Sequence, residues 1–402
     1  MKINRYPFKV CRWSLISFVS LVGLINPAVA QQIELEKPNI SAKSYVLMDY
    51  NSGQILVSDL PNKKLSPASL TKMMTSYIIG QELKTGNIRE DDQVLISAKA
   101  WSKNFPDSSR MFIEVGKKVS VSELNQGIVV QSGNDACVAM AEHIAGSEEG
   151  FASMMNQWSR QLGMKNTHFI NSHGLDSDNH FTTAYDMAVL ARSLIRDVPE
   201  EYKLYAQKDF TFNGIKQYNR NSLLWDKNLN VDGIKTGHTS EAGFSLVTSS
   251  IQNEMRLIAV VMGANSSRSR VSESKKLLKF GFRYFESVTP YHAGESFVSH
   301  RIWYGDKNYV SLGVLQDTPF SVLRGQAASV EAYFELTESL EAPVKKGQVV
   351  GKLNFSIGDD VVAAFPLVAL EEIQESGWLG KLYDYLVQLL ERMLESMKAT
   401  MA

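Results

Sequence analysis

The distribution of apolar and polar positions along the chain predicts alternating groups of strands and helices. Apolar runs at 45–48 and 55–57 flank a polar Asn-Ser-Gly turn, which is typical of a β-hairpin. The stretch 65–83 follows, and it is apolar on nearly every side of a helix, so it predicts a buried helix. Ser66 and Pro67 fit the N-cap and the first residue of this helix.

Further apolar segments have helical spacing. One runs from 121 to 129 and another from 136 to 145, with the polar loop 132–135 between them. A tight polar loop between two buried helices is expected to direct its side chains into a cleft. Residues 183–196 and 271–285 are also predicted to be mainly helical.

Two long apolar segments, 243–251 and 257–262, predict antiparallel strands joined by a Gln-Asn-Glu turn. With the first hairpin they are expected to form one sheet, and the order of strands and helices predicts an α+β layered fold. From 297 to 370 the pattern changes to short alternating runs with Gly and Pro turns, which predicts a small all-β domain. That domain has no cluster of catalytic residue types, so we expect a spacer or docking module.

The last segment, 377–402, is predicted to be one amphipathic helix with an apolar stripe. The stripe comprises Leu382, Leu386, Leu389, Leu390, Met393 and Met397, with Trp378, Leu379 and Tyr385 at its start. We expect this helix to lie in a membrane interface, with packing on its own domain or dimerisation as the alternatives. Because its acidic and basic residues balance, attachment would depend on apolar burial rather than on charge.

Residues 1–30 have the composition of a cleavable export signal. Four basic residues precede the short apolar core 13–25, and Ala28-Val29-Ala30 provides a small-x-small cleavage site. A transmembrane anchor is the alternative, but the apolar run is short and contains Ser and Gly. The expected layout is a signal at 1–30, a catalytic domain at 31–287, a β-rich domain at 288–374 and a membrane-anchoring helix at 375–402.

The overall composition is that of a folded protein, and it excludes some classes of partner. Of the 402 residues, 44% are hydrophobic and 21% are charged, and the formal net charge is -1. Because no polybasic segment occurs, nucleic acid is not expected as a partner. Once the signal is removed Cys137 is the only cysteine, so no intrachain disulfide can form and a small buried side chain is expected.

The helix predicted at 65–83 carries a serine and a lysine three residues apart, Ser69 and Lys72. This spacing places both side chains on one face, so the hydroxyl and the amine are expected to lie close together. Burial lowers the pKa of a lysine, which frees the amine to accept a proton from a nucleophilic serine. The pattern alone is weak evidence, because Ser272 and Lys275 repeat it.

Two further short motifs follow in the chain. Ser132-Gly133-Asn134 lies in the predicted loop between two buried helices, and Lys235-Thr236-Gly237 lies in a run expected to form a strand beside the cleft. Similar strings occur at 84–86, 102–104 and 177–179, but in other contexts. The ordered triple Ser-x-x-Lys, Ser-x-Asn and Lys-Thr-Gly resembles that of the penicilloyl-serine transferases.

Longer stretches around these motifs, 66–72, 131–136 and 232–238, resemble the low-molecular-mass D-alanyl-D-alanine carboxypeptidases. The leader, the β-rich domain and the amphipathic tail are also similar, so the resemblance covers essentially the whole chain. It implies a membrane-anchored penicillin-binding protein that removes the terminal D-alanine from peptidoglycan pentapeptides and is acylated by β-lactam antibiotics. It also implies a peripheral location on the periplasmic face of the inner membrane, and we expect no metal and no cofactor.

The resemblance implies a role for each motif residue. Ser69 would attack the penultimate D-Ala carbonyl with neutral Lys72 as general base, and Ser132 would relay a proton towards the departing amine. The backbone N–H groups of Ser69 and His238 would form the oxyanion hole. Asn134 would bind the peptide backbone of the substrate.

Substrate-binding groups are expected on and near the strand of the third motif. They are Lys235, Thr236, Gly237, His238, Arg220 and Arg270. The family implies that Thr236 and the arginines bind the free carboxylate, because guanidinium matches carboxylate in a bidentate manner. Surface ion pairs are the alternative for the arginines, and the charge of Lys235 is expected to lower the pKa of Lys72.

The segment 164–183 contains His168, His173 and His180 without any metal-ligand spacing, so a polar loop is expected. The family implies that part of it borders the site and that His173 assists deacylation.

Three other functions stay open as alternatives. A β-lactamase would need a glutamate to activate water, but no Glu-x-x-Leu-Asn string occurs between Asn134 and Lys235. The absence of this string predicts slow hydrolysis of a β-lactam adduct. A cross-link endopeptidase is a second alternative. A cell-wall binding module with a vestigial site is the third, and the intact motif residues count against it.

Overall fold

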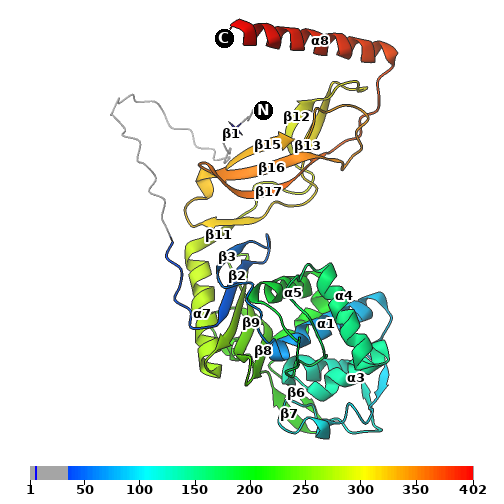
Figure 1. Ribbon diagram of the computed structural model, residues 1–402, viewed down its shortest axis with the longest axis vertical. Coiled ribbons are helices and arrows are strands. Elements are labelled where there is room, and N and C mark those ends of the chain that lie inside the picture. Colours follow the sequence, from blue (N-terminus) through cyan, green and yellow to red (C-terminus); the bar gives the residue numbers. More distant parts are fainter. Residues whose placement is uncertain (1–4, 7–34, 402) are drawn as a thin grey trace. The chain divides into compact units, whose positions relative to one another are not determined.

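The computed structural model describes residues 5–6 and 35–401 of the chain (Figure 1). Most of the expected signal, 1–30, therefore lies outside the described residues. The exception is strand β1 (Arg5–Tyr6), which pairs with strand β15 (Glu331–Leu336). From residue 35 onwards the chain forms two compact units, one ending at Phe285 and one beginning at Glu286.

The first unit is built on a five-stranded antiparallel sheet of order β3-β2-β10-β9-β8. Its strands are β2 (Ser44–Asp49), β3 (Ile55–Asp59), β8 (Val231–Thr239), β9 (Gly243–Gln252) and β10 (Met255–Ala264). The predicted hairpin and the two predicted long strands are confirmed, and they share one sheet as expected. Strand β8, which carries the Lys-Thr-Gly motif, lies at the edge of this sheet.

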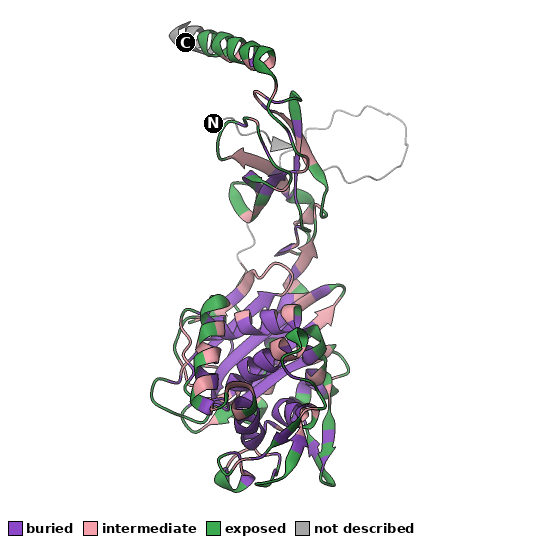
Figure 2. Ribbon diagram, turned by 90° about the vertical axis from the view of Figure 1, so that its right-hand side faces the viewer, coloured by how far each residue is buried: buried purple, intermediate pink, exposed green. Residues whose placement is uncertain are grey.

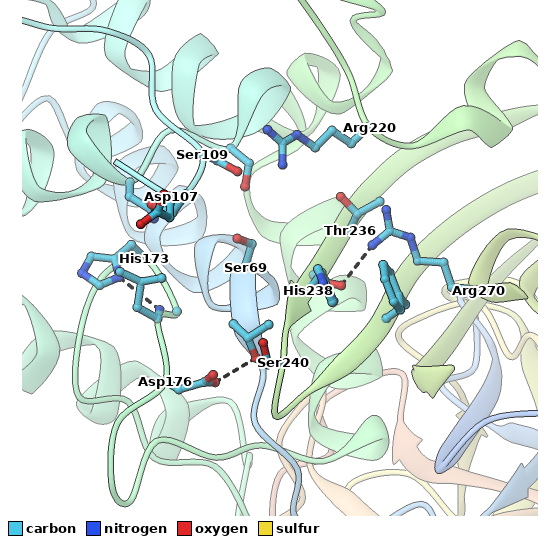
Figure 3. A pocket seen from close by; sticks show the side chains of 18 residues that line it. Ser69, Asp107, Ser109, His173, Asp176, Arg220, Thr236, His238, Ser240 and Arg270 are labelled. Atoms are coloured by element: carbon cyan, nitrogen blue, oxygen red, sulfur yellow. Dashed lines mark hydrogen bonds between the residues drawn. The ribbon is translucent and has the colours of Figure 1, made fainter. Parts of the chain in front are cut away.

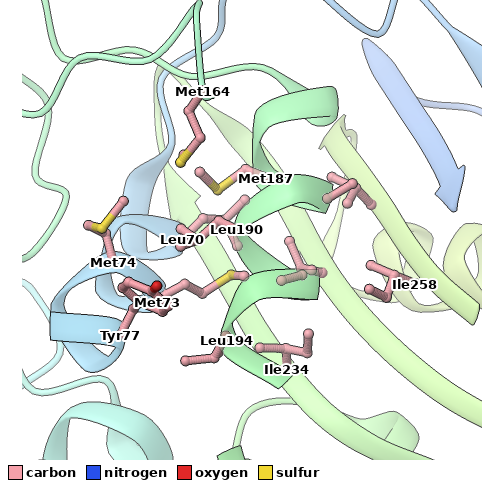
Figure 4. Packing of buried hydrophobic residues seen from close by; sticks show 14 of the residues in the cluster. Leu70, Met73, Met74, Tyr77, Met164, Met187, Leu190, Leu194, Ile234 and Ile258 are labelled. Carbon is pink, nitrogen blue, oxygen red and sulfur yellow. The ribbon is translucent and has the colours of Figure 1, made fainter. Parts of the chain in front are cut away.

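Helices pack against the sheet because their apolar faces match its buried strands. Helix α7 (Ser267–Tyr284) packs on β9 and β10, and helix α5 (Ala184–Asp197) packs on β2 and β10. At Gly281 a Cβ atom would lie 2.5 Å from a methyl of Leu257, so the absence of a side chain permits the close approach of α7. Figure 4 shows Met187, Leu190 and Leu194 of α5 meeting side chains of the helix that follows Ser69.

The helix predicted at 65–83 is present, but its start differs from the prediction. A 3-10 turn, η1 (Ala68–Thr71), precedes helix α1 (Lys72–Thr85), so Ser69 lies in the turn and Lys72 is the first α-helical residue. Ser66 does not cap the helix. Its hydroxyl instead donates a hydrogen bond to Asp176 Oδ1 at 2.6 Å, because the loop 171–176 packs against this turn.

The other helices lie around α1, and buried residues fill the space between them (Figure 2). The predicted pair is present as α2 (Val121–Gln126), the π-helical turn η3 (Gly127–Gln131) and α3 (Asn134–Ala145). Helix α4 (Glu148–Gln161) was not predicted from the sequence.

Shorter elements complete this unit. They are β4 (Gln93–Leu95), η2 (Ser102–Asn104), β5 (Lys118–Ser120), α6 (Pro199–Tyr202), η4 (Lys203–Ala206), β6 (Asp209–Phe212), β7 (Ile215–Tyr218) and η5 (Ser222–Trp225).

The second unit is the predicted β-rich domain, with a six-stranded sheet of order β1-β15-β16-β17-β13-β12 and the separate pair β11-β14. Its remaining strands are β11 (Phe285–Val288), β12 (Ser296–Arg301), β13 (Tyr309–Gly313), β14 (Phe320–Leu323), β16 (Val349–Ile357) and β17 (Asp360–Ala369), with the turn η6 (Ala327–Ser329). Phe320, Leu353 and Phe355 are at the centre of its core. The fold of the whole chain is therefore α+β, as expected.

The terminal helix α8 (Trp378–Met401) contacts the second unit through its polar side. Asp384 is buried, and its carboxylate accepts hydrogen bonds at 2.6 Å from both Arg301 Nη2 and the backbone N–H of Tyr304. The Tyr304 hydroxyl donates to Gln388 Oε1 at 3.0 Å. The apolar stripe is exposed from Leu382 to Met393, which reverses the usual arrangement of a helix on a globular domain.

No helix within the described ranges is both long enough and apolar enough to cross a membrane.

Candidate active site

The turn that carries Ser69 is held by close backbone packing on two sides. Ala68 has a left-handed φ of 48°, and the loop residue Gly174 approaches it so closely that a Cβ at 174 would lie 1.8 Å from the Ala68 carbonyl oxygen. On the other side, a Cβ at Gly237 of β8 would lie 2.9 Å from the Pro67 carbonyl oxygen. The position of Ser69 is therefore set by two glycines that let neighbouring segments approach the turn.

Lys72 is fully buried, and its amine has three hydrogen-bond partners. Its Nζ lies 2.9 Å from Ser69 Oγ, 2.7 Å from Asn134 Oδ1 and 2.6 Å from the His173 carbonyl oxygen. The Asn134 side-chain amide donates to Ser108 Oγ at 2.8 Å, so its oxygen is the atom that faces the lysine.

The three partners of Lys72 are chemically different. Asn134 Oδ1 and the His173 carbonyl can only accept hydrogen bonds, whereas the Ser69 hydroxyl can also donate one. A neutral amine has two hydrogens and one lone pair. With both hydrogens given to the two acceptors, the lone pair points at the Ser69 hydroxyl, which is the geometry that proton abstraction requires.

The pKa of Lys72 is lowered to about 8, mainly by burial, and the positive charge of Arg220 contributes to the decrease. The pKa of Lys235 is also held well below its usual value, first by burial and then by the charge of Lys72. Burial, rather than the charge of Lys235, is thus the main cause of the low pKa of Lys72. Both amines therefore lose a proton more readily than an exposed lysine does, because burial disfavours the charged form.

The second motif lies between η3 and α3, as predicted for a loop that points into a cleft. Ser132 has a left-handed φ of 70°, and its buried hydroxyl has no hydrogen-bond partner among the residues that the structure describes. The carboxylate of Asp135 accepts backbone N–H bonds from Met111 at 2.8 Å and Phe112 at 2.9 Å. Asp135 therefore holds the loop that brings Ser108 to Asn134.

The third motif forms one wall of the site. Lys235 and Thr236 are buried on β8, and the His238 ring stacks on Phe244 with a centroid distance of 3.8 Å. Arg270 of α7 donates a hydrogen bond from Nη1 to the Gly237 carbonyl oxygen at 3.0 Å. In Figure 3, Ser69 lies between this wall and the loop that carries His173.

The His173 side chain is buried and neutral, because burial lowers its pKa to about 3. Its Nδ1 accepts the backbone N–H of Leu175 at 3.1 Å, and its Nε2 lies 3.4 Å from Glu148 Oε1. One ring nitrogen is thus engaged within the loop and the other faces Glu148 of α4. The part of His173 that contacts Lys72 is its backbone carbonyl.

These elements enclose a cleft of about 650 Å³. It is lined by nine of the eleven expected site residues, Ser69, Ser132, Asn134, His173, Arg220, Thr236, Gly237, His238 and Arg270. Lys72 and Lys235 are buried and do not line the cleft surface. The geometry brings all three motifs together, from η1, the loop before α3, and β8.

Sequence reasoning missed the loop that carries Asp107, Ser108 and Ser109, which also lines the cleft. The stretch is polar and has no motif of its own. Only the hydrogen bonds to Asn134 and Asp135 place it at the site, and those partners are more than 20 residues away along the chain. In the described ranges, no group of His, Cys, Asp or Glu side chains could hold a metal ion.

A serine hydroxyl beside a buried lysine of lowered pKa, on a helical layer packed against an antiparallel sheet, defines an active-site-serine enzyme of the acyl-transfer class. Comparison with known proteins narrows the class. Residues 31–266 match the family model for D-alanyl-D-alanine carboxypeptidase, and residues 285–375 match the C-terminal domain of penicillin-binding protein 5. The chain belongs to the D-alanyl-D-alanine carboxypeptidase family.

Individual relatives are similar over most of their length. The D-alanyl-D-alanine carboxypeptidase DacA of Haemophilus influenzae is 49% identical over 93% of this chain and 95% of its own. DacA of Escherichia coli is 50% identical over 87% of this chain and 88% of its own. The crystal structure of penicillin-binding protein 5 from Haemophilus influenzae, at 50% identity, has a TM-score of 0.83 over 85% of this chain and 100% of its own.

These findings establish the activity. The chain is a penicillin-binding protein and a serine-type D-Ala-D-Ala carboxypeptidase, as the sequence motifs predicted.

Replacing Gly174 by Ala is expected to lower the rate of acylation by a fluorescent penicillin about 100-fold or more, because displacing the Ser69 turn by an ångström misaligns the reacting groups. The clash with the Ala68 carbonyl leaves no room for the new methyl group. Gly163→Ala is the matched control, since Gly163 also has a left-handed φ, 78°, but its Cβ would meet nothing within 4 Å. Equal labelling rates for the two variants would show that the close approach of Gly174 does not set the position of Ser69.

Proposed function

We propose that Ser69 forms the acyl-enzyme, with Lys72 as its general base. The observation that carries this proposal is the pair of acceptors, Asn134 Oδ1 and the His173 carbonyl, which direct the lone pair of a neutral Lys72 at Ser69 Oγ. The serine attacks the carbonyl of the penultimate D-Ala, its proton passes to Lys72, and the terminal D-Ala leaves. Water then releases the shortened peptide.

The leaving amine needs a proton, and we propose that Ser132 supplies the path. Its hydroxyl lines the cleft without a partner among the described residues, so it is available to the amine of the departing D-Ala. The backbone N–H groups of Ser69 and His238 would stabilise the oxyanion.

The two arginines support different roles in binding the substrate carboxylate. Arg270 is buried and donates a hydrogen bond from Nη1 to the Gly237 carbonyl, so it stabilises strand β8 as well as adding positive charge. Arg220 is exposed and lines the cleft on the same side as Thr236. We propose Thr236 and Arg220 as the direct partners of the carboxylate, with Arg270 behind them.

Slow hydrolysis of a β-lactam adduct also fits this site. We propose that His173 assists deacylation through its backbone carbonyl, which accepts a hydrogen bond from Lys72. The imidazole ring is neutral, and its two nitrogens are already engaged by the Leu175 N–H and by Glu148. This leaves Lys72 as the base for water in deacylation too. Because no Glu-x-x-Leu-Asn string occurs between Asn134 and Lys235 to supply the water-activating glutamate of a β-lactamase, β-lactam antibiotics would inhibit the enzyme by remaining on Ser69.

We also propose the cellular layout predicted from the sequence, in which the enzyme is exported and its terminal helix lies on the outer face of the cytoplasmic membrane. The catalytic domain would span 31–287, the β-rich domain 288–374 and the anchor 375–402. The exposed apolar stripe of α8, opposite the docked Asp384, supports the anchor. An apolar helix face that is exposed at Leu382, Leu386, Leu389 and Leu390 is suited to lipid.

Mass spectrometry tests the catalytic proposal directly. Incubation with benzylpenicillin is expected to leave a long-lived penicilloyl group on the peptide containing Ser69, and a muramyl pentapeptide is expected to lose one D-Ala. Ser69→Ala should abolish both reactions, whereas Ser66→Ala, which changes a neighbouring hydroxyl outside the cleft, should retain them. Hydrolysed penicillin with an intact pentapeptide would instead indicate a β-lactamase.

The rate of acylation is expected to rise with pH and to level off above about 8, where Lys72 becomes neutral. Below that value each pH unit should lower the rate about tenfold, because only the unprotonated amine accepts the proton of Ser69. His173 and His180, whose pKa values burial lowers to about 3 and about 4, do not titrate in this range. A rate that stays constant between about pH 6 and 9 would exclude Lys72 as the base.

Sedimentation with phosphatidylethanolamine–phosphatidylglycerol vesicles tests the anchor. The full chain is expected to bind, and Leu382→Glu with Leu386→Glu should release it, because charged residues on the exposed stripe oppose burial in lipid. Glu391→Gln, at an exposed position of the same helix, is the control and should still bind. Release of the wild-type chain by salt alone would show that charge, not apolar burial, provides the attachment.

A further inference from the structure

One buried carboxylate beside the cleft is not explained by the mechanism. Glu148 is the first residue of helix α4, which Ser147 caps by accepting the Gly150 N–H at 3.0 Å. Its side chain is only 11% exposed, and it lies against the loop 171–175 that forms one wall of the cleft. Carboxylates are rarely buried unless they are paired or hydrogen-bonded, so its partners indicate what it does.

Glu148 binds the loop at two successive residues. Its Oε1 accepts hydrogen bonds from the Ser172 backbone N–H at 3.2 Å and the Ser172 hydroxyl at 2.8 Å. The same oxygen lies 3.4 Å from His173 Nε2. Because His173 Nδ1 accepts the Leu175 N–H, the ring hydrogen is on Nε2 and points to the glutamate. The other oxygen, Oε2, lies 3.5 Å from Lys99 Nζ.

The same two loop residues face α1 with their carbonyl groups. The Ser172 carbonyl accepts from Thr75 Oγ1 at 2.6 Å, and the His173 carbonyl accepts from Lys72 Nζ at 2.6 Å. The loop is thus fixed from both sides, by its donors to Glu148 and by its acceptors to α1. The glutamate is thus the partner that holds Ser172 and His173 from the side opposite α1.

We propose that Glu148 is a positioning residue for the reaction. It acts through Ser172 and His173 to keep the His173 carbonyl on Lys72, so that the lone pair of the amine remains directed at Ser69. It does not touch the substrate. This inference rests on the proposed role of Lys72 as the base.

The neighbouring residue Glu149 provides a matched control. It is also acidic and also pairs with Lys99, at 3.0 Å, but its side chain is 78% exposed and it has no hydrogen bond to the loop. Two adjacent glutamates thus share a lysine, but only Glu148 is buried against the loop and contacts Ser172 and His173.

The test is steady-state release of D-Ala from a muramyl pentapeptide by the full chain. Glu148→Ala is expected to lower kcat about tenfold, because small displacements of catalytic groups slow chemistry, and to leave KM within about twofold, because the carboxylate-binding side chains are on the opposite wall. Glu148→Gln keeps an oxygen acceptor for Ser172 and should recover most of the loss. Glu149→Ala should leave kcat and KM within about twofold of the wild type.

A wild-type kcat in Glu148→Ala, or an equal loss in Glu149→Ala, would overturn the proposal. If Glu148→Ala does not fold, Ser172→Ala tests the same contact: it removes the hydroxyl that donates to Glu148 Oε1, so it should lower kcat and leave KM within about twofold of the wild type. A wild-type kcat in Ser172→Ala would also overturn the proposal. A wild-type chain that neither acylates nor releases D-Ala would instead refute the proposed function.

Discussion

The arrangement of this site depends on keeping one lysine amine dry and held by acceptors. An amine in water is protonated and mobile, whereas Lys72 is fully buried and its two carbonyl-type partners take its hydrogens. Three segments that are remote in the sequence must meet for this to happen: the start of α1, the start of α3 and the loop after α4. The helices of the first unit pack around these three segments and hold them in contact, and the helical layer packs against the sheet.

The sequence was sufficient to predict the fold class, the central hairpin, the long strands and most helices, because apolar spacing reports directly on burial. The motif residues were also found from the sequence, because the ordered triple Ser-x-x-Lys, Ser-x-Asn and Lys-Thr-Gly resembles a known family, although each motif alone recurs elsewhere in the chain. The start of α1 was not, because Ser66 and Pro67 have good capping chemistry but a tertiary hydrogen bond to Asp176 takes the hydroxyl. Site residues that are placed by long-range contacts, such as Ser108 and Glu148, could not be predicted, because no local sequence motif marks them.

The helices of the two units bury opposite faces against their domains. In the first, helix α7 turns its apolar face to the sheet, and glycine allows a backbone approach where a side chain would not fit. In the second, α8 turns Asp384 and Gln388 to its own domain and leaves the leucines outside. Apolar helix residues thus stabilise the core in the first unit, whereas in the second unit they are left exposed for attachment. Only the tertiary contacts of each helix distinguish the two cases.

Strand β8 is the last strand of its sheet, so its outer backbone groups have no neighbouring strand in the described part of the chain. An open edge can accept an extended peptide as an added strand, but it also exposes a protein to pairing with other chains and to aggregation. Here the edge lies within a cleft bordered by Ser132, His173 and Asp176, so a thin single chain has access and a folded sheet does not. The walls that position the chemistry therefore also protect the enzyme against association through its own active site.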